Sequence, residues 1–147
     1  LGRRRTITRM SCILRVAGKT LDVDALASAS PLKPYRLDRL GERRTPTSQV
    51  NMAVHQDSCA HYVVSDQDLA PLEVQVADAI RFLTQHREAL VAMLHFPGVE
   101  GGSLDFGIEW RDVFVHTDLL PAELLSLVGA LGLGIELSHY PGDGEEQ

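Results

Sequence analysis

The chain has 147 residues and a formal net charge of -6; apolar residues make up 44% of it and charged residues 23%. These fractions are near the averages of soluble globular domains, so the chain is neither disordered nor fibrous. No stretch approaches the roughly 18–20 apolar residues of a membrane-spanning helix, and the start does not resemble a secretory signal. Two cysteines are too few for a disulfide framework. We therefore expect a cytoplasmic protein with one hydrophobic core and no membrane contact.

The basic residues are concentrated in the first third of the chain. Residues 1–44 carry a net charge of +7 and residues 45–147 a net charge of -13. Residues 1–9, ahead of Met10, are interpreted as a basic extension that is disordered or non-native, the alternative being an arm that orders on a partner. Residues 141–147 are predicted to be a disordered acidic tail. A single domain is therefore expected over residues 10–140.

The first elements are predicted to be a strand, a short helix and a second strand. Apolar residues favour a strand over residues 12–18, and a helix over residues 23–30 is capped by Asp22 or Thr20. Proline residues end this helix, and a strand follows around residues 35–37, where apolar side chains recur with a period of two.

A further strand and a long helix are predicted next. Val50, Met52 and Val54 alternate with polar residues, which is typical of a half-buried strand. Residues 70–94 have apolar side chains at helical spacing, with a break predicted near residues 84–86.

The last third is predicted to be strand, strand, helix and strand. Alternation over residues 104–110 predicts a strand whose apolar face ends in Trp110, interpreted as a core residue. A short strand is predicted over residues 113–115, a helix from Pro121 that ends at Gly132, and a last strand around residues 135–137.

This order of elements repeats one scheme. Leu14 lies 21 positions before Tyr35, Phe114 lies 21 before Ile135, and a helix separates the two in each case. Two such strand-helix-strand units favour an α+β fold of the ferredoxin-like kind. In it, helices pack on one face of a largely antiparallel sheet.

Several segments resemble a known family. They are residues 34–42, 48–54, 81–83, 86–90 and 124–140. In these segments the chain is similar to the functionally uncharacterised bacterial proteins catalogued as domain of unknown function 4279, over nearly all of residues 12–140. The resemblance implies an α+β fold and assigns no catalytic residue.

One group of residues has the chemistry of a metal site. His55, Asp57, Cys59 and His61 occupy alternate positions, so in an extended strand all four would point to one side. Their ligand types suit zinc, but alternate side chains of a strand lie roughly 6–7 Å apart, too far for one ion. A curled loop would bring two or three of them together. The simpler interpretation is a polar loop between Val54 and the long helix.

Other candidate sites are weaker. The six histidines form no recognisable nucleophile motif, and the chain lacks the Gly-x-Ser-x-Gly, phosphate-loop and His-Glu-x-x-His patterns. Asp105 and Glu109 share a strand face, but at about 13 Å they exceed the roughly 5–9.5 Å of paired glycosidase carboxylates. We interpret both as solvated charges.

A basic hairpin is predicted in the first third. Its positive residues are Lys33, Arg36, Arg39, Arg43 and Arg44. Only Tyr35 is near to stack on a base, and the rest of the chain is acidic, so nucleic acid is not the expected partner. An exposed hairpin without a ligand is the simpler interpretation, with a protein partner as the alternative.

The sequence therefore favours a non-catalytic module without a cofactor. We expect it to bind a macromolecule, either a protein partner or its own copy through an exposed strand edge. An immunity-like role, in which it neutralises a toxin, is an analogy that fits a small acidic protein. The alternative is a small metal-dependent enzyme that uses His55, Cys59 and His61.

Overall fold

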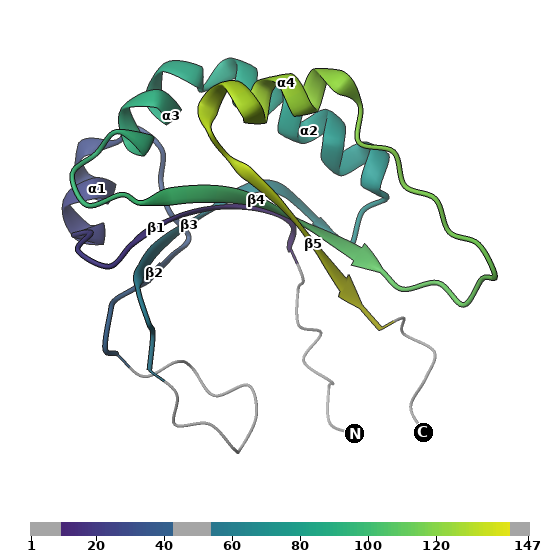
Figure 1. The fold of residues 1–147 in the computed structure, drawn as a ribbon, viewed down its shortest axis with the longest axis horizontal. Helices are drawn as coiled ribbons and strands as arrows, with labels where there is room; N and C mark the ends of the chain where they lie inside the picture. Colours follow the sequence, from purple (N-terminus) through teal and green to yellow (C-terminus); the bar gives the residue numbers. More distant parts are fainter. Residues whose placement is uncertain (1–9, 43–53, 142–147) are drawn as a thin grey trace.

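A computed structural model describes residues 10–42 and 54–141 (Figure 1). Its elements in chain order are β1 (Met10–Gly18), α1 (Val23–Ala29), β2 (Arg36–Asp38), β3 (Ser58–Asp68), α2 (Leu72–Gln85), α3 (Arg87–Leu94), β4 (Gly101–Glu109), α4 (Ala122–Leu131) and β5 (Gly134–Tyr140). The five strands form one sheet in the order β2-β3-β1-β4-β5. β4 and β5 run parallel, and the other neighbours are antiparallel. The α+β class and the largely antiparallel sheet are confirmed.

The helices and the sheet enclose one hydrophobic core. α2, α3 and α4 lie across one face of the sheet, and α1 lies beside its end (Figure 1). Cys12, Leu14 and Val16 of β1 are fully buried in this core, which also includes Leu26 of α1. Successive side chains of a strand point to opposite faces, so Arg15 belongs to the face without helices, here called the open face. No helix in residues 10–42 or 54–141 is long and apolar enough to cross a lipid bilayer.

Local chemistry explains several helix ends. The Asp22 carboxylate accepts a hydrogen bond from the Ala25 N–H at 3.0 Å, so Asp22 rather than Thr20 caps α1. The long helical segment divides at His86 into α2 and α3, as its spacing predicts. Gly132 ends α4 in the left-handed region at φ 71°, where a glycine has no steric penalty.

The prediction of a polar loop between Val54 and the long helix is wrong for most of that segment, which forms a strand. β3 begins at Ser58, runs for 11 residues and lies between β1 and β2. Its Ala60 and Tyr62 are buried in the core, whereas His61 is buried through polar partners. Because a polar residue such as His61 is buried in β3, the strand has no regular alternation of apolar and polar residues from which it could be predicted. Of the strand predicted at residues 50–54, only Val54 lies within the described residues, and it forms an isolated bridge.

The strand predicted at residues 113–115 is absent, and that segment is irregular. Trp110, predicted to be in the core, is 56% exposed. The scheme of two repeated units is therefore not confirmed, because its second unit needs a strand at residues 113–115. In addition, β2 pairs with β3 and not with β1, so the first unit is not closed on itself. The predicted extension at residues 1–9 and nearly all of the predicted tail lie outside the described residues.

Candidate functional site

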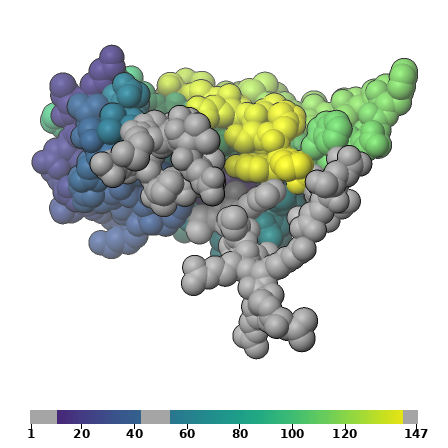
Figure 2. Space-filling model, turned by 90° about the horizontal axis from the view of Figure 1, so that it is seen from below, coloured from purple at the N-terminus to yellow at the C-terminus, as the bar shows by residue number. Residues whose placement is uncertain are grey.

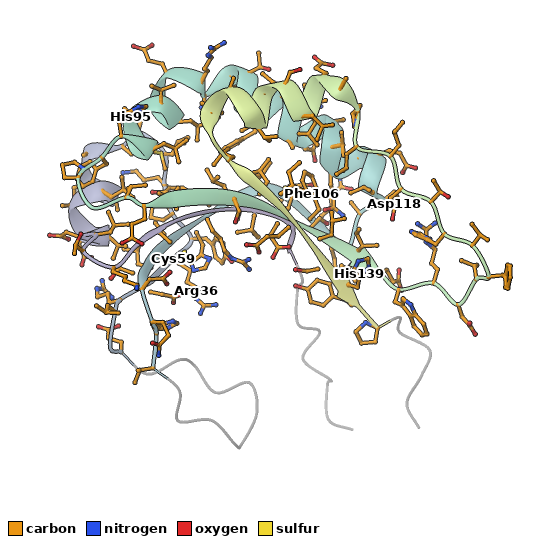
Figure 3. The ribbon with its side chains drawn as sticks, in the orientation of Figure 1. Arg36, Cys59, His95, Phe106, Asp118 and His139 are labelled. Atoms are coloured by element: carbon orange, nitrogen blue, oxygen red, sulfur yellow. The ribbon has the colours of Figure 1, made fainter. Side chains whose placement is uncertain are left out.

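A cavity of about 690 Å³ lies on the open face of the sheet. In Figure 3, Arg36 and Cys59 lie on the side of the sheet away from α2, α3 and α4. This open-face cavity is lined by Arg15, Ala17, Arg36, Asp38, His55, Asp57, Cys59, His61, Glu100, Gly101, Gly102, Ser103 and Glu136. Its volume is within the range of small-molecule sites, roughly 300–1,000 Å³.

The carboxylate of Asp38 is the centre of a polar cluster in this cavity. It accepts hydrogen bonds from His61 Nε2 and from Arg36 Nε, each at 2.8 Å, and His55 Nε2 lies 3.5 Å away. The strand register brings these groups together, because Arg36 pairs with His61 and Asp38 with Cys59 across β2 and β3. Burial opposes ionisation of Asp38, but the hydrogen bonds from Arg36 and His61 outweigh it and lower the pKa of Asp38.

His61 is 6% exposed and is held in one orientation. Burial lowers the pKa of its imidazole, although the hydrogen bond to Asp38 opposes this effect, so the ring is neutral at neutral pH. A carboxylate only accepts hydrogen bonds, so Nε2 carries the hydrogen and Nδ1 has a lone pair. Nδ1 has no hydrogen-bond partner among the described residues. The ring also meets the edge of Tyr35, with 6.0 Å between the ring centroids.

Cys59 lies two residues from His61 on the same strand. Burial raises the pKa of its thiol to about 11, and the nearby carboxylate of Asp57 adds to the effect. The thiol donates a weak hydrogen bond to the carbonyl of Ala60 at 3.8 Å. A protonated thiol is a poor nucleophile and a poor metal ligand, so the environment does not activate Cys59.

A second polar cluster adjoins the cavity where β1, β4 and β5 meet. Arg15 Nη1 lies 2.9 Å from Asp105 Oδ2 and 3.0 Å from Glu136 Oε2. Ser138 donates a hydrogen bond to Asp105 at 2.6 Å, and Ser103 donates one to Glu136 at 3.2 Å. Asp105 is only 5% exposed, so its interpretation as a solvated charge is wrong. Glu109, on the same strand, is exposed as predicted.

The four candidate metal ligands all line the open-face cavity, but they do not converge on one point. Nε2 of His55 and Nε2 of His61 both face Asp38. Within residues 10–42 and 54–141, no group of three or more His, Cys, Asp or Glu side chains is arranged to hold a metal ion. Sequence reasoning missed Asp38 and Arg15, which reach the cavity from other strands. The Arg36-x-Asp38 spacing, which puts both residues on one strand face, was the available signal.

The described part of the basic hairpin is largely neutralised by carboxylates. Arg36 is paired with Asp38, and Arg39 lies 2.7 Å from Asp24 and 3.8 Å from Glu42. Arg43 and Arg44 lie outside the described residues.

A different surface lies between β4 and α4. Residues 110–119, here called the apolar arm, project from the body of the molecule at the right of Figure 2. Besides Trp110 they expose Val113, Phe114, Val115 and Leu119, and Phe114 is fully exposed. His116 and Asp118 are 2.6 Å apart, and Arg111 lies 3.6 Å from Asp118, so these three residues pair with one another, whereas Asp112 is exposed.

The arm and the end of the sheet enclose a groove of about 480 Å³. Trp110, Val113 and Phe114 line it from the arm, and His139, which Figure 3 shows on β5, lines it from the sheet. The backbone N–H of Trp110 donates a hydrogen bond to the backbone carbonyl of Tyr140 at 2.6 Å and so connects the start of the arm to the end of β5. The groove is therefore continuous with β5, the last strand of the sheet in the described part of the chain.

Comparison with protein-family models, with curated proteins and with solved structures finds no match. The resemblance to domain of unknown function 4279 stays a prediction. Any functional assignment must therefore come from the cavity and from the surface formed by the arm and β5.

Proposed function

We propose that the protein is a non-catalytic interaction module that binds through β5 and the apolar arm, and that a second copy of the chain occupies this surface. The observation that carries the proposal is the arm itself. Five large apolar side chains lie exposed on ten consecutive residues, while Arg111, His116 and Asp118 pair with one another. Contiguous exposed apolar surface of this kind marks an interaction site on a folded protein.

β5 supports the proposal as an open edge strand. It is seven residues long, whereas β2 at the other edge has three. An edge strand presents unpaired N–H and C=O groups, and folded proteins usually protect such edges by shortness, lysine or proline. β5 is not short, and its seven residues include no lysine or proline.

The sequence of β5 fits antiparallel pairing with itself about Leu137. In that register Leu137 faces its own counterpart, Ile135 faces His139, and Glu136 faces Ser138 of the second copy. This register keeps the two Glu136 carboxylates apart. That is favourable, because like charges directly opposite each other would destabilise the pair. Leu137 is 42% exposed and would become covered. A twofold axis of this kind gives the commonest closed oligomer, the dimer.

The same pairing would place the arm against the second copy. The arm starts beside Tyr140, and in an antiparallel pair this end of β5 meets Gly134 of the other chain. In the second copy, Leu131 and Gly132 form the corner between α4 and β5 and come just before Gly134 in the sequence. The apolar groove beside the arm would therefore receive this corner, adding side-chain burial to the backbone hydrogen bonds of the edge.

The catalytic alternative has less support from the geometry. A metal-dependent enzyme would use His55, Cys59 and His61, but both histidines face Asp38 and the Cys59 thiol stays protonated. Zinc titration is the direct check on it. Under the interaction proposal zinc leaves the thermal midpoint unchanged, whereas a rise that Cys59→Ala abolishes would support the enzyme.

Analytical ultracentrifugation tests the proposed dimer. The wild type is expected to shift from monomer to dimer as its concentration rises, whereas Leu137→Lys stays monomeric, because two lysines would face each other at the centre of the edge. Phe114→Ser should weaken the dimer without abolishing it.

Val91→Lys is the matched control, because Val91 is 41% exposed but lies on α3, away from β5. This variant should dimerise like the wild type. A wild type that stays monomeric up to its solubility limit would contradict the second copy as occupant.

A further inference from the structure

The open-face cavity has more hydrogen-bond acceptors and negative charge than its own residues satisfy. Four carboxylates line it against two guanidinium groups, a net charge of -2 when the histidines are counted as neutral. We propose that this cavity binds an organic cation, a ligand with a primary ammonium or guanidinium group.

Both arginines of the cavity are already engaged by carboxylates. Arg36 donates to Asp38 at 2.8 Å. Arg15 lies within 3.0 Å of both Asp105 and Glu136. An incoming anion would have to compete with these internal carboxylates for the guanidinium groups. The cavity therefore offers an anion little uncompensated positive charge.

Two of the carboxylates have no such counterion among the described residues. The side chains of Asp57 and Glu100 line the cavity and make no hydrogen bond or ion pair with other residues of the described ranges. Asp57 comes directly before β3, and Glu100 directly before β4, so they lie on opposite sides of β1. The Glu100 N–H donates to the carbonyl of Ala17, and Ser58 pairs with Gly18. Two strand spacings, about 10 Å, therefore separate their backbones.

The floor between these carboxylates is made of small residues. Ala17 and Gly101 face each other across β1 and β4 and both line the cavity. A Cβ placed on Gly101 would have no atom within 4 Å, so this glycine borders open space. The end of an alkylammonium or guanidinium group fits between two carboxylates over such a floor.

His61 supplies an independent indication of the ligand's chemistry. Its side chain is 8% exposed and lines the cavity, and its Nδ1 is a buried acceptor with no partner in the described structure. Arg15 and Arg36 flank it on the neighbouring strands, and both side chains are partly exposed. Within the part of the chain that the structure describes, the carboxylates of Asp57 and Glu100 and the Nδ1 of His61 are hydrogen-bond acceptors without a partner.

Three probes with the same four-carbon chain test the proposal: 1,4-diaminobutane, 1,4-butanediol and succinate. Binding of each to the full chain is measured by calorimetry and by the amide NMR shifts of Ala17, Cys59 and Gly101. We expect saturable binding of the diamine, with shifts at these three amides, and no binding of the diol or succinate. The double variant Asp57→Asn, Glu100→Gln should weaken diamine binding about tenfold.

Gly101→Leu should abolish binding by filling the cavity without a clash of its Cβ, and an unchanged urea midpoint would show that it folds. Gly129→Leu is the matched control, because Gly129 on α4 also borders open space but lies outside the cavity. Binding of succinate in place of the diamine would overturn the proposal and assign the cavity to anions through Arg15 and Arg36. Equal binding to Gly101→Leu, or no binding of any probe, would overturn it as well.

Discussion

At the scale of single residues, the structure depends on polar side chains that are buried with specific partners. His61 and Asp38 are the clearest pair, because a hydrogen bond joins their side chains and Asp38 also accepts one from Arg36. Their titration therefore couples to folding.

The stability of the protein should fall on mild acidification. Burial lowers the pKa of His61 below its ordinary value of about 6.5, so the unfolded chain takes up this proton at higher pH than the folded chain. Between the two pKa values the unfolded state binds more protons, and the free energy of unfolding declines as the pH falls. The lowered pKa of Asp38 adds a further loss below about pH 4.

Urea denaturation of the wild type and of His61→Gln, between pH 5 and pH 8, measures this effect. The wild-type midpoint should decrease below about pH 6.5, and the decrease should be smaller in the variant, which cannot take up the proton. A wild-type midpoint that rises on acidification would show that the Asp38 hydrogen bond outweighs burial at His61.

The candidate site could be predicted only in part at this scale. The alternation of His55, Asp57, Cys59 and His61 predicts that all four would point to one side of an extended strand. All four line the cavity, although only Cys59 and His61 lie on β3. Asp38 and Arg15 could not be placed there, since they come from other strands and their position depends on sheet register. The unpartnered Nδ1 of His61 likewise follows from tertiary contacts.

At the scale of elements, local signals predicted the helices well. Asp22, His86 and Gly132 mark helix ends through capping or backbone conformation, which act within a few residues of the chain. β3 was missed because His61 and Ser65 are buried by Asp38 and Asp78, whose partnership has no local signal. The exposure of Trp110 could not be predicted, because an apolar pattern does not distinguish a buried side chain from an exposed one.

One connection between elements depends on a close backbone approach. A Cβ on Gly18, at the end of β1, would overlap the carbonyl oxygen of Gly98. Gly18→Ala should therefore lower the free energy of unfolding by about 2 kcal/mol or more, because backbone would have to move. Chemical denaturation checks this value.

Gly101→Ala is the control for that substitution. Gly101 lies in the same sheet with open space beside it, so its effect should stay within about 0.5 kcal/mol. Equal losses in the two variants would show that the loss at Gly18 comes from strand glycines in general and not from the contact with Gly98.

At the scale of the whole molecule, the two faces of the sheet have different roles. One face is filled by the helices, and the open face holds the polar cavity. The edge at β5 and the apolar arm are the surfaces through which we propose contact with another chain. The proposed dimer would join two sheets through their β5 strands and leave both cavities in place.

Cysteine cross-linking tests the register of that dimer, which is the central claim. Residues directly opposite in an antiparallel pair have Cα atoms about 4.5–5.5 Å apart, within the span of a disulfide. The native Cys12 and Cys59 are buried and should not interfere. Under mild oxidation Leu137→Cys should form a covalent dimer rapidly. Ile135→Cys should not, because its two copies would lie about 13 Å apart along the edge.

The most direct measurement compares the rate of disulfide formation in Leu137→Cys with that in Val91→Cys, whose position on α3 allows only random encounters. The account predicts that Leu137→Cys cross-links much faster, and that Ile135→Cys cross-links only when it is mixed with His139→Cys. Equal rates at positions 137 and 91 would contradict a dimer that forms through β5.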